Sequence, residues 1–242
     1  MTDTAALALP QLILLPGLLN DAELWRDQIS GLADVARCWV PDLAPYATLH
    51  AMAESVLAQA EPTFAVAGFS MGGYVAQEIA RIAPQRIQRL ALLDTSIRVD
   101  TPERAAQRKA LNKAAAKGGT FLGIGQAIMK SYVDASRLDD ADLTGRIVDM
   151  TQRLGREVFL RQNSLEREDG EAALKALRVP LVIICGENDQ ITPAAGHREM
   201  AWAIGCSHLV VIPNAGHMTP MEAPGPVNGA LRHWLQRPAG RR

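Results

Sequence analysis

The sequence has little charge imbalance, no long apolar run and no basic leader. Its 242 residues carry a formal net charge of −1, which gives no electrostatic footprint for binding nucleic acid or an anionic membrane. No apolar run approaches the ~18 residues of a membrane-spanning helix. The first residues, MTDTAALALPQ, lack the basic start and long apolar stretch of a signal peptide. We therefore expect neither a nucleic-acid partner nor a membrane partner.

Cysteine and aromatic residues are also scarce. Cys38, Cys185 and Cys206 are scattered, and their spacing fits neither a disulfide framework nor a zinc site. Cys38 and Cys185 lie in apolar runs, where a buried thiol is the simpler interpretation. This cysteine usage suits the reducing cytoplasm, which is the expected location. Aromatic residues make up 5% of the chain and form no obvious interface patch, so the oligomeric state stays open.

Short apolar runs rich in Val, Ile and Leu alternate with longer helical patterns along most of the chain. Continuous apolar runs are typical of a parallel sheet that is covered on both faces. The runs are residues 12–15, 37–40, 64–68, 90–94, 181–186 and 209–213. Helical patterns follow most of them, at residues 22–33, 49–60, 71–83, 194–203 and 226–236. This alternation predicts a doubly wound α/β fold with about six mostly parallel strands.

The alternation stops between residues 97 and 177, where no convincing strand is found. This stretch indicates several helices, with breaks near Gly118–Gly119, Gly123–Gly125 and Asp169–Gly170. Its basic and acidic residues balance, which indicates a solvated outer face. The apolar side chains expected to face inward are Phe121, Ile124, Ile128, Met129, Val133, Leu154, Phe159 and Leu160. We predict a helical insertion at 97–177 in a core formed by residues 1–96 and 178–242.

Reactive side chains stand where several of the predicted strands end. Ser70, Asp94, Asp189 and His217 each come at the end of an apolar run or shortly after it. In open α/β sheets, ligands bind beyond the carboxyl ends of the strands. These side chains should therefore meet at one edge of the sheet.

The stretch Gly68-Phe69-Ser70-Met71-Gly72 matches the pattern G-x-S-x-G between a predicted strand and a predicted helix. A serine nucleophile must project from a sharp turn so that its hydroxyl reaches both substrate and base. The turn crowds its neighbours, so only glycine fits two positions before and after the serine. The backbone N–H of Met71 would then face an oxyanion hole at the start of the helix. A helix cap with incidental glycines is the alternative interpretation of Ser70.

His217 is the preferred candidate for the base that takes the serine proton. It follows the last apolar run in a loop with a glycine, NAGHMTP, and it comes last in the order serine, acid, histidine. For the acid that orients the imidazole we prefer Asp189, because its loop, CGENDQITP, carries turn residues and a proline suited to begin a helix. Asp94 and Glu187 are its rivals, and a hydrogen-bonding role at a strand end is the alternative for Asp94.

Five stretches, in this order, resemble the α/β-hydrolase superfamily in its capped esterase and lactonase-like branch. They are LILLPGLLNDAELW, AGFSMGGYVAQEIA, LALLDTS, LVIICGENDQITP and IPNAGHMTPMEAP. The resemblance implies that Ser70 is the nucleophile, Asp189 the acid and His217 the base. It also implies that the N–H groups of Leu18 and Met71 form the oxyanion hole, and that the insertion is a helical cap that shapes the pocket.

The chain departs from the family's pattern in two places. The family usually has His-Gly after the first strand, whereas this chain has Pro16-Gly17. Proline has no N–H and fixes φ, so the hydrogen bonds that support the oxyanion loop must differ. Few residues precede the first apolar run, so the family's leading antiparallel strands are expected to be mostly missing.

The substrate pocket is expected to be apolar near the serine and to receive side chains from the cap. The residues expected to line it are Leu18, Leu19, Phe69, Met71, Met129, Phe159, Arg161 and Met218. Four polar residues belong either to a solvated helix face or to the pocket wall, namely Arg153, Arg161, Gln162 and Asn163. An inward arginine among them would suit a substrate carboxylate.

These residues predict a carboxylesterase-like serine hydrolase that acts on a small-molecule substrate. It would cleave a small or medium ester, thioester or lactone through an acyl-enzyme on Ser70, with no cofactor and no metal. The fold hosts many reactions, so C–C bond hydrolysis, a lyase reaction and perhydrolysis are alternatives. A ligand-binding module on an inactive scaffold is a further alternative, against which stands the presence of all three residue types.

Overall fold

The computed structural model describes residues 9–238, so most of the N-terminal stretch compared with a signal peptide lies outside the described residues. Six strands form one sheet in the order β2-β1-β3-β4-β5-β6, and every neighbouring pair is parallel. The strands are β1 (Gln11–Leu15), β2 (Arg37–Trp39), β3 (Phe64–Phe69), β4 (Ile87–Leu93), β5 (Leu181–Gly186) and β6 (Leu209–Ile212). The predicted α/β fold with a six-stranded parallel sheet is confirmed.

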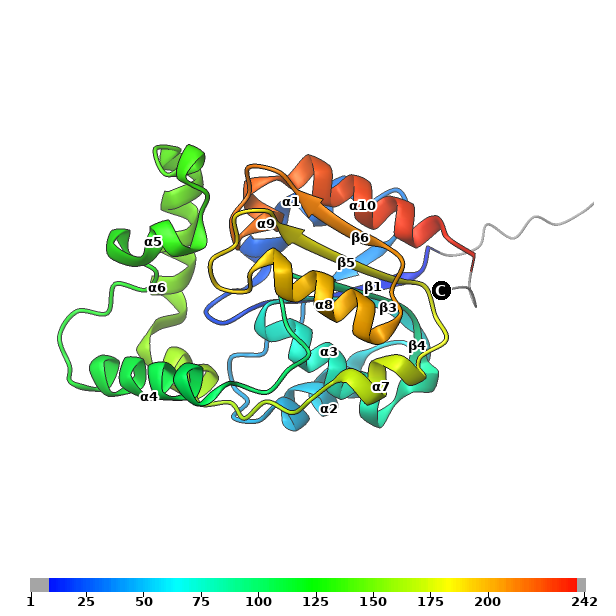
Figure 1. Ribbon diagram of the computed structural model, residues 1–242, viewed down its shortest axis with the longest axis horizontal. Coiled ribbons are helices and arrows are strands. Elements are labelled where there is room, and N and C mark those ends of the chain that lie inside the picture. Colours follow the sequence, from blue (N-terminus) through cyan, green and yellow to red (C-terminus); the bar gives the residue numbers. More distant parts are fainter. Residues whose placement is uncertain (1–8, 239–242) are drawn as a thin grey trace, which may run out of the picture.

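Helices cover both faces of this sheet (Figure 1). Side chains alternate between the two faces along each strand, so Leu12 and Leu14 pack on one side while Ile13 and Leu15 pack on the other. The helices on the first face are α1 (Arg26–Gly31), α9 (Thr219–Glu222) and α10 (Pro224–Gln236). Those on the second face are α2 (Leu49–Gln59), α3 (Met71–Ile82), α7 (Glu171–Ala176) and α8 (Ala194–Ile204).

Three further helices lie between β4 and β5 in the sequence and to one side of the sheet, beyond the carboxyl ends of the strands (Figure 1). They are α4 (Pro102–Ala116), α5 (Gln126–Tyr132) and α6 (Ala141–Asn163), and we call them the α4–α6 segment. Within the segment α4 packs against α6, whereas α7 packs against α3 and α8 beside the sheet. The insertion predicted to end at residue 177 therefore includes one helix whose contacts are with the core.

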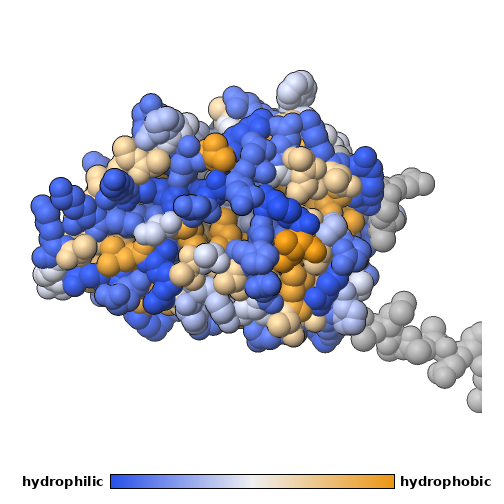
Figure 2. Space-filling view, turned by 90° about the horizontal axis from the view of Figure 1, so that it is seen from below, coloured by the Kyte–Doolittle hydropathy of each residue, from blue (hydrophilic) through white to orange (hydrophobic). Residues whose placement is uncertain are grey.

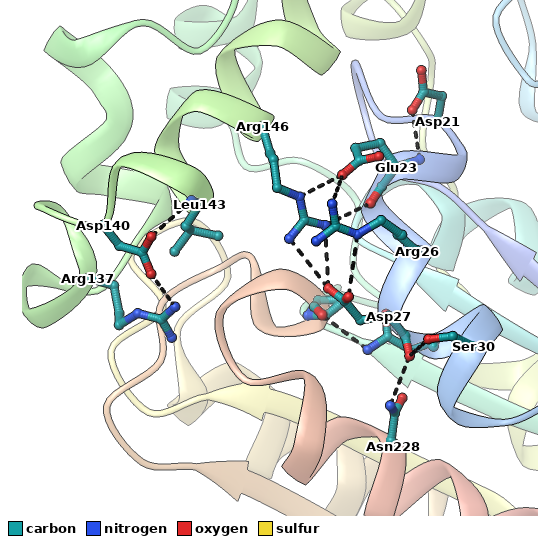
Figure 3. Close-up of polar contacts among 12 residues, drawn as sticks. Asp21, Glu23, Arg26, Asp27, Ser30, Arg137, Asp140, Leu143, Arg146 and Asn228 are labelled. Atoms are coloured by element: carbon teal, nitrogen blue, oxygen red, sulfur yellow. Dashed lines mark hydrogen bonds and ion pairs between the residues drawn. The ribbon is translucent and has the colours of Figure 1, made fainter.

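An arginine on α6 joins the α4–α6 segment to the start of α1 (Figure 3). Arg146 Nε lies 2.6 Å from Glu23 Oε1, and its Nη2 lies 3.4 Å from Asp27 Oδ2. Further along α6 the helical backbone is interrupted at Gly155, with φ 80° and ψ 179°. Glycine reaches this conformation without a steric penalty. The interruption separates the half of α6 that holds Arg146 from the half that holds Gln162, whose side chain contacts the loop after β1.

The surface on the side of α4, α2 and α7 is mostly hydrophilic, with separate small hydrophobic patches (Figure 2). α4 itself has no buried residue. None of the helices in residues 9–238 has both the length and the apolar composition to cross a membrane.

Candidate active site

Ser70 lies in the sharp turn between β3 and α3. Its φ of 49° and ψ of −112° are values that side-chain-bearing residues rarely adopt. A Cβ at Gly68 would lie 2.5 Å from the carbonyl oxygen of Gly72, and a Cβ at Gly72 would lie 2.3 Å from the carbonyl oxygen of Leu15. The Ser70 carbonyl accepts a 2.7 Å hydrogen bond from Thr95 Oγ1. Close backbone packing thus requires both glycines and holds the serine in its strained conformation.

Ser70, His217 and Asp189 form one chain of hydrogen bonds. Ser70 Oγ lies 3.0 Å from His217 Nε2, and His217 Nδ1 lies 2.8 Å from Asp189 Oδ2. His217 is 2% exposed and Asp189 4% exposed, so water competes little for these bonds. In this arrangement the imidazole can take a proton from Ser70 while the carboxylate fixes the orientation of the ring.

The surroundings of Asp189 favour its ionised form. Its Oδ1 accepts the N–H groups of Ile191 and Thr192 at 2.8 and 2.9 Å, and its Oδ2 accepts Thr192 Oγ1 at 2.7 Å. Burial by itself raises the pKa of Asp189, but the charge of His217 and the hydrogen bonds from His217 and Thr192 bring the pKa below its usual value. Asp189 therefore carries a negative charge beside the imidazole.

The rivals considered for the acid occupy other places. Asp94 is fully buried, and its Oδ1 accepts the N–H of Gly186 at 3.0 Å while its Oδ2 accepts Thr219 Oγ1. Burial, followed by the charge of Asp189, raises the pKa of Asp94 well above its usual value. Asp94 thus joins the ends of β4 and β5 to α9, which matches the strand-end role that was its alternative. Glu187 is exposed.

A buried glutamate that the sequence interpretation did not single out holds the His217 loop. Glu222 on α9 is 3% exposed. Its Oε1 accepts the N–H of Met218 at 2.9 Å, and its Oε2 accepts those of Gly216 and Asp134 at 3.0 and 2.8 Å. Burial raises the pKa of Glu222, and these N–H bonds oppose that rise. The carboxylate of Glu222 therefore holds the backbone on both sides of His217, at Gly216 and at Met218.

The loop after β1 is held by the far end of α6. Leu19 has a φ of 55°, and its N–H donates a buried 2.8 Å hydrogen bond to Gln162 Oε1. A side chain from the α4–α6 segment thus supports the loop that begins with Pro16-Gly17. Within residues 9–238, the N–H groups of Leu18 and Met71 have no hydrogen-bond partner, so both can donate to a bound ligand.

A cavity of about 380 Å³ contains Ser70 and His217 in its wall. The predicted pocket residues that line it are Leu18, Phe69 and Met218. Asn163, which could belong either to a solvated helix face or to the pocket wall, lines it as well. Ile124 and Ile128 also line it. Ile128 was expected to face inward, but it is 44% exposed because it faces this open cavity.

The other predicted pocket residues lie away from the cavity wall, namely Leu19, Met71, Met129, Phe159 and Arg161. The side chains of Leu19, Met71 and Met129 are buried in the core. The ring of Phe159 packs against that of Phe121, with centroids 5.8 Å apart. The guanidinium of Arg161 donates to the carbonyl of Ala44. The side chains of Phe159 and Arg161 are thus held by neighbours that a pattern of residue types does not reveal.

Three other arginines do line the cavity, and the sequence interpretation missed them. They are Arg104 and Arg108 on α4 and Arg167, which follows α6. The residues of α4 that line the cavity are Arg104, Gln107, Arg108 and Leu111. Counted from Arg104, the others follow three, four and seven residues later, which places all four on one face of the helix. That spacing is the signal in the sequence that could have identified this face of α4.

Comparison with known proteins identifies the family. The profile of the Alpha/beta hydrolase family matches residues 12–230. The chain belongs to this family, as the five motif stretches predicted.

Named relatives and solved structures are similar over most of the chain. A pimeloyl-[acyl-carrier protein] methyl ester esterase from Neisseria meningitidis serogroup C is 28% identical over 182 residues, which are 72% of this chain and 71% of that protein. A thermophilic esterase from Thermogutta terrifontis, solved with malate bound, has a TM-score of 0.82 at 30% identity and covers 94% of this chain and 89% of its own. The enol-lactonase from Burkholderia xenovorans LB400 has a TM-score of 0.82 at 22% identity, over 95% of this chain and 92% of its own. This similarity shows that the two proteins share a fold.

Proposed function

We propose that this protein is a serine hydrolase that cleaves a carboxylic ester, thioester or lactone through an acyl-enzyme on Ser70. The observation that carries the proposal is the buried hydrogen-bonded chain from Ser70 Oγ through His217 to Asp189, beside an open cavity. Relatives named as esterases support an ester substrate. The substrate is a small molecule, and the reaction uses neither a cofactor nor a metal.

The geometry supports a two-step reaction. His217 Nε2 takes the proton of Ser70 as the serine oxygen attacks the carbonyl carbon of the substrate. The N–H groups of Leu18 and Met71 stabilise the negative charge on the former carbonyl oxygen. His217 then gives its proton to the leaving alcohol or thiol, and the acyl group stays on Ser70. In the second step His217 takes a proton from a water, whose oxygen attacks the acyl carbon. The bond between that carbon and Ser70 Oγ then breaks, His217 gives the proton to Ser70 Oγ, and the acid leaves.

We further propose that residues 97–177 contribute a cap through the α4–α6 segment. The segment supplies Arg104, Arg108, Ile124 and Ile128 to the cavity wall, and Gln162 to the oxyanion loop. Substrate would reach Ser70 between this segment and the edge of the sheet.

The proposed function is tested by ester turnover in wild-type protein, Ser70→Ala and a control, Ser30→Ala. Ser30 is exposed, and within residues 9–238 its hydroxyl donates only to the carbonyl of Asp27. On a panel of nitrophenyl esters, thioesters and lactones, we expect Ser70→Ala to lower kcat by at least about 10³-fold and Ser30→Ala to leave it unchanged. Turnover by folded Ser70→Ala near the wild-type rate would refute the proposal.

A further inference from the structure

One wall of the cavity beside Ser70 is cationic. Arg104, Arg108 and Arg167 all line it, and we call these three residues the arginine wall. No aspartate or glutamate is among the described residues that line the same cavity. A ligand in the cavity therefore meets positive side chains and no acidic side chain in the wall itself.

A single carboxylate outside the cavity wall pairs with the arginine wall. Asp100 Oδ1 lies 2.8 Å from Arg167 Nη1 and 3.6 Å from Arg104 Nε, and Asp100 Oδ2 contacts Arg108 Nη1. One negative charge thus faces three positive charges. Burial, together with the charge of Arg167, lowers the pKa of Arg108, although a guanidinium stays protonated in proteins. The cluster favours an additional anion.

Arg108 and Arg104 differ in how many of their N–H donors remain available for a ligand. Arg108 is committed to the fold, because its Nε and Nη2 donate to the carbonyls of Asn163 and Leu165. Among the described contacts, the guanidinium of Arg104 makes one hydrogen bond, from Nη1 to the carbonyl of Ile191, besides its 3.6 Å ion pair with Asp100, and the side chain is 39% exposed. A guanidinium has five N–H donors, so Arg104 has donors left for a ligand.

Apolar side chains also line the cavity. Phe69, Ile124 and Met218 line it together with Ser70 and His217. At about 380 Å³ the cavity lies at the small end of ligand sites in proteins. It therefore suits a small ligand with an apolar chain next to the reacting carbonyl and an anionic group elsewhere in the molecule.

We propose that the substrate is an ester, thioester or lactone that carries a carboxylate, and that Arg104 of the arginine wall binds this carboxylate while Ser70 attacks the ester carbonyl. Guanidinium and carboxylate pair through two parallel hydrogen bonds, which fixes the orientation of the ligand. This inference rests on the proposed function for its reacting group. The carboxylate preference itself can be measured without turnover.

The first experiment compares monoethyl esters of succinate, glutarate and adipate with the corresponding diethyl esters, which lack the charge. We expect wild-type protein to have a higher kcat/KM for the monoethyl esters, and this preference to decrease in high salt. Arg104→Gln should lower the preference about tenfold, and Arg104→Lys should retain part of it. Arg232→Gln is the control, because it removes an arginine on α10 that pairs with Asp34 and does not line the cavity.

The second experiment measures binding of monoethyl and diethyl glutarate to Ser70→Ala by calorimetry, where no hydrolysis occurs. Tighter binding of the monoethyl ester supports the inference even if turnover is not detected. Equal binding of the two esters, or an unchanged preference in folded Arg104→Gln, overturns the inference while the serine mechanism stands. Loss of all ester turnover together with retained carboxylate binding would instead refute the proposed function alone.

Discussion

The carboxyl edge of the sheet and the α4–α6 segment contribute to the same cavity by different means. At the sheet edge, Ser70, Asp189 and His217 stand in short loops after buried strands, and hydrogen bonds between buried groups hold them. In the segment, α4 has no buried residue. Its cavity face reaches the site through long side chains such as Arg104 and Arg108, which are held by ion pairs and by carbonyl groups.

We infer from this difference that the sheet edge carries out the reaction, whereas the α4–α6 segment determines which substrate binds. Groups fixed by short connections and buried bonds keep the sub-ångström geometry that proton transfer needs. Long, partly exposed side chains tolerate change, so they can alter which substrate binds without moving the reacting atoms. Substitutions at the sheet edge should therefore reduce turnover of every ester, whereas substitution of Arg104 should change the order of preference among esters.

The largest effect is expected from Asp189→Asn at the sheet edge, with Asp94→Asn as its matched control. Asp189 accepts the bond from His217 Nδ1, whereas Asp94 bonds only to Gly186 and Thr219 among the described side-chain contacts. Asp189→Asn favours the wrong tautomer of the imidazole, so we expect kcat to fall by about 10⁴-fold. Asp94→Asn should leave kcat within about tenfold of wild type, because Asp94 only supports the strand ends.

Steady-state kinetics on one ester, with circular dichroism to verify folding, tests this pair. The reverse ranking of the two variants would show that Asp94 is the acid and that the assignment of Asp189 is wrong.

A smaller effect is expected where the segment contacts the sheet edge, at Gln162. Its Oε1 accepts the N–H of Leu19, whose φ of 55° is strained for a leucine. Gln162→Leu leaves that buried N–H unpaired, so the loop should shift and move the Leu18 donor. We expect a loss in kcat of about 10- to 100-fold with little change in KM.

The matched control is Gln152→Leu, which removes an exposed glutamine from the same helix. Gln162→Glu keeps an acceptor for the N–H of Leu19 and should recover part of the lost rate. If Gln162→Leu raises KM and leaves kcat unchanged, the glutamine contacts substrate and does not support the oxyanion loop.

The smallest effect concerns stability and pH. The pKa of Asp94 is raised in the folded protein, so its contribution to stability is full below its unfolded pKa and is lost as pH rises through its folded pKa. Asparagine does not titrate. The free energy of unfolding of Asp94→Asn should therefore rise relative to wild type as pH increases from about 4 towards the folded pKa of Asp94, by at most about 1.4 kcal/mol per pH unit.

Urea unfolding of both proteins across this range measures the difference. The pKa of Asp189 is lowered in the folded protein. Its contribution to the free energy of unfolding is therefore present at higher pH and is lost as pH falls. A gap between Asp94→Asn and wild type that stays constant with pH would contradict the raised pKa of Asp94.

The sheet and the residues at its edge were predictable because local patterns encode them. Each strand overlaps one of the predicted apolar runs, although β1, β2 and β4 also include polar residues. The strand ends carry Ser70, Asp189 and His217 in loops with glycine, proline or asparagine. Parallel strands bring their carboxyl ends together whatever the details of packing. Knowing the strands was therefore sufficient to expect these three residues at one edge.

The cavity wall was less predictable because it depends on how the α4–α6 segment docks. Arg161 was expected in the pocket, but its guanidinium reaches the carbonyl of Ala44. Arg104 and Arg108 line the cavity instead, and which face of α4 turns inward follows from contacts such as Arg108 with Asn163, far apart in sequence. Likewise the three N–H groups around Glu222 meet only in the folded chain.

The most direct test of the central claim is intact-mass analysis after reaction with a fluorophosphonate, on wild-type protein and on Ser70→Ala. Such a probe reacts with a serine whose hydroxyl is activated by a neighbouring base. We predict one adduct on wild-type protein and none on Ser70→Ala. Folded wild-type protein without an adduct, or an adduct that persists in Ser70→Ala, would contradict the assignment of Ser70 as the activated nucleophile.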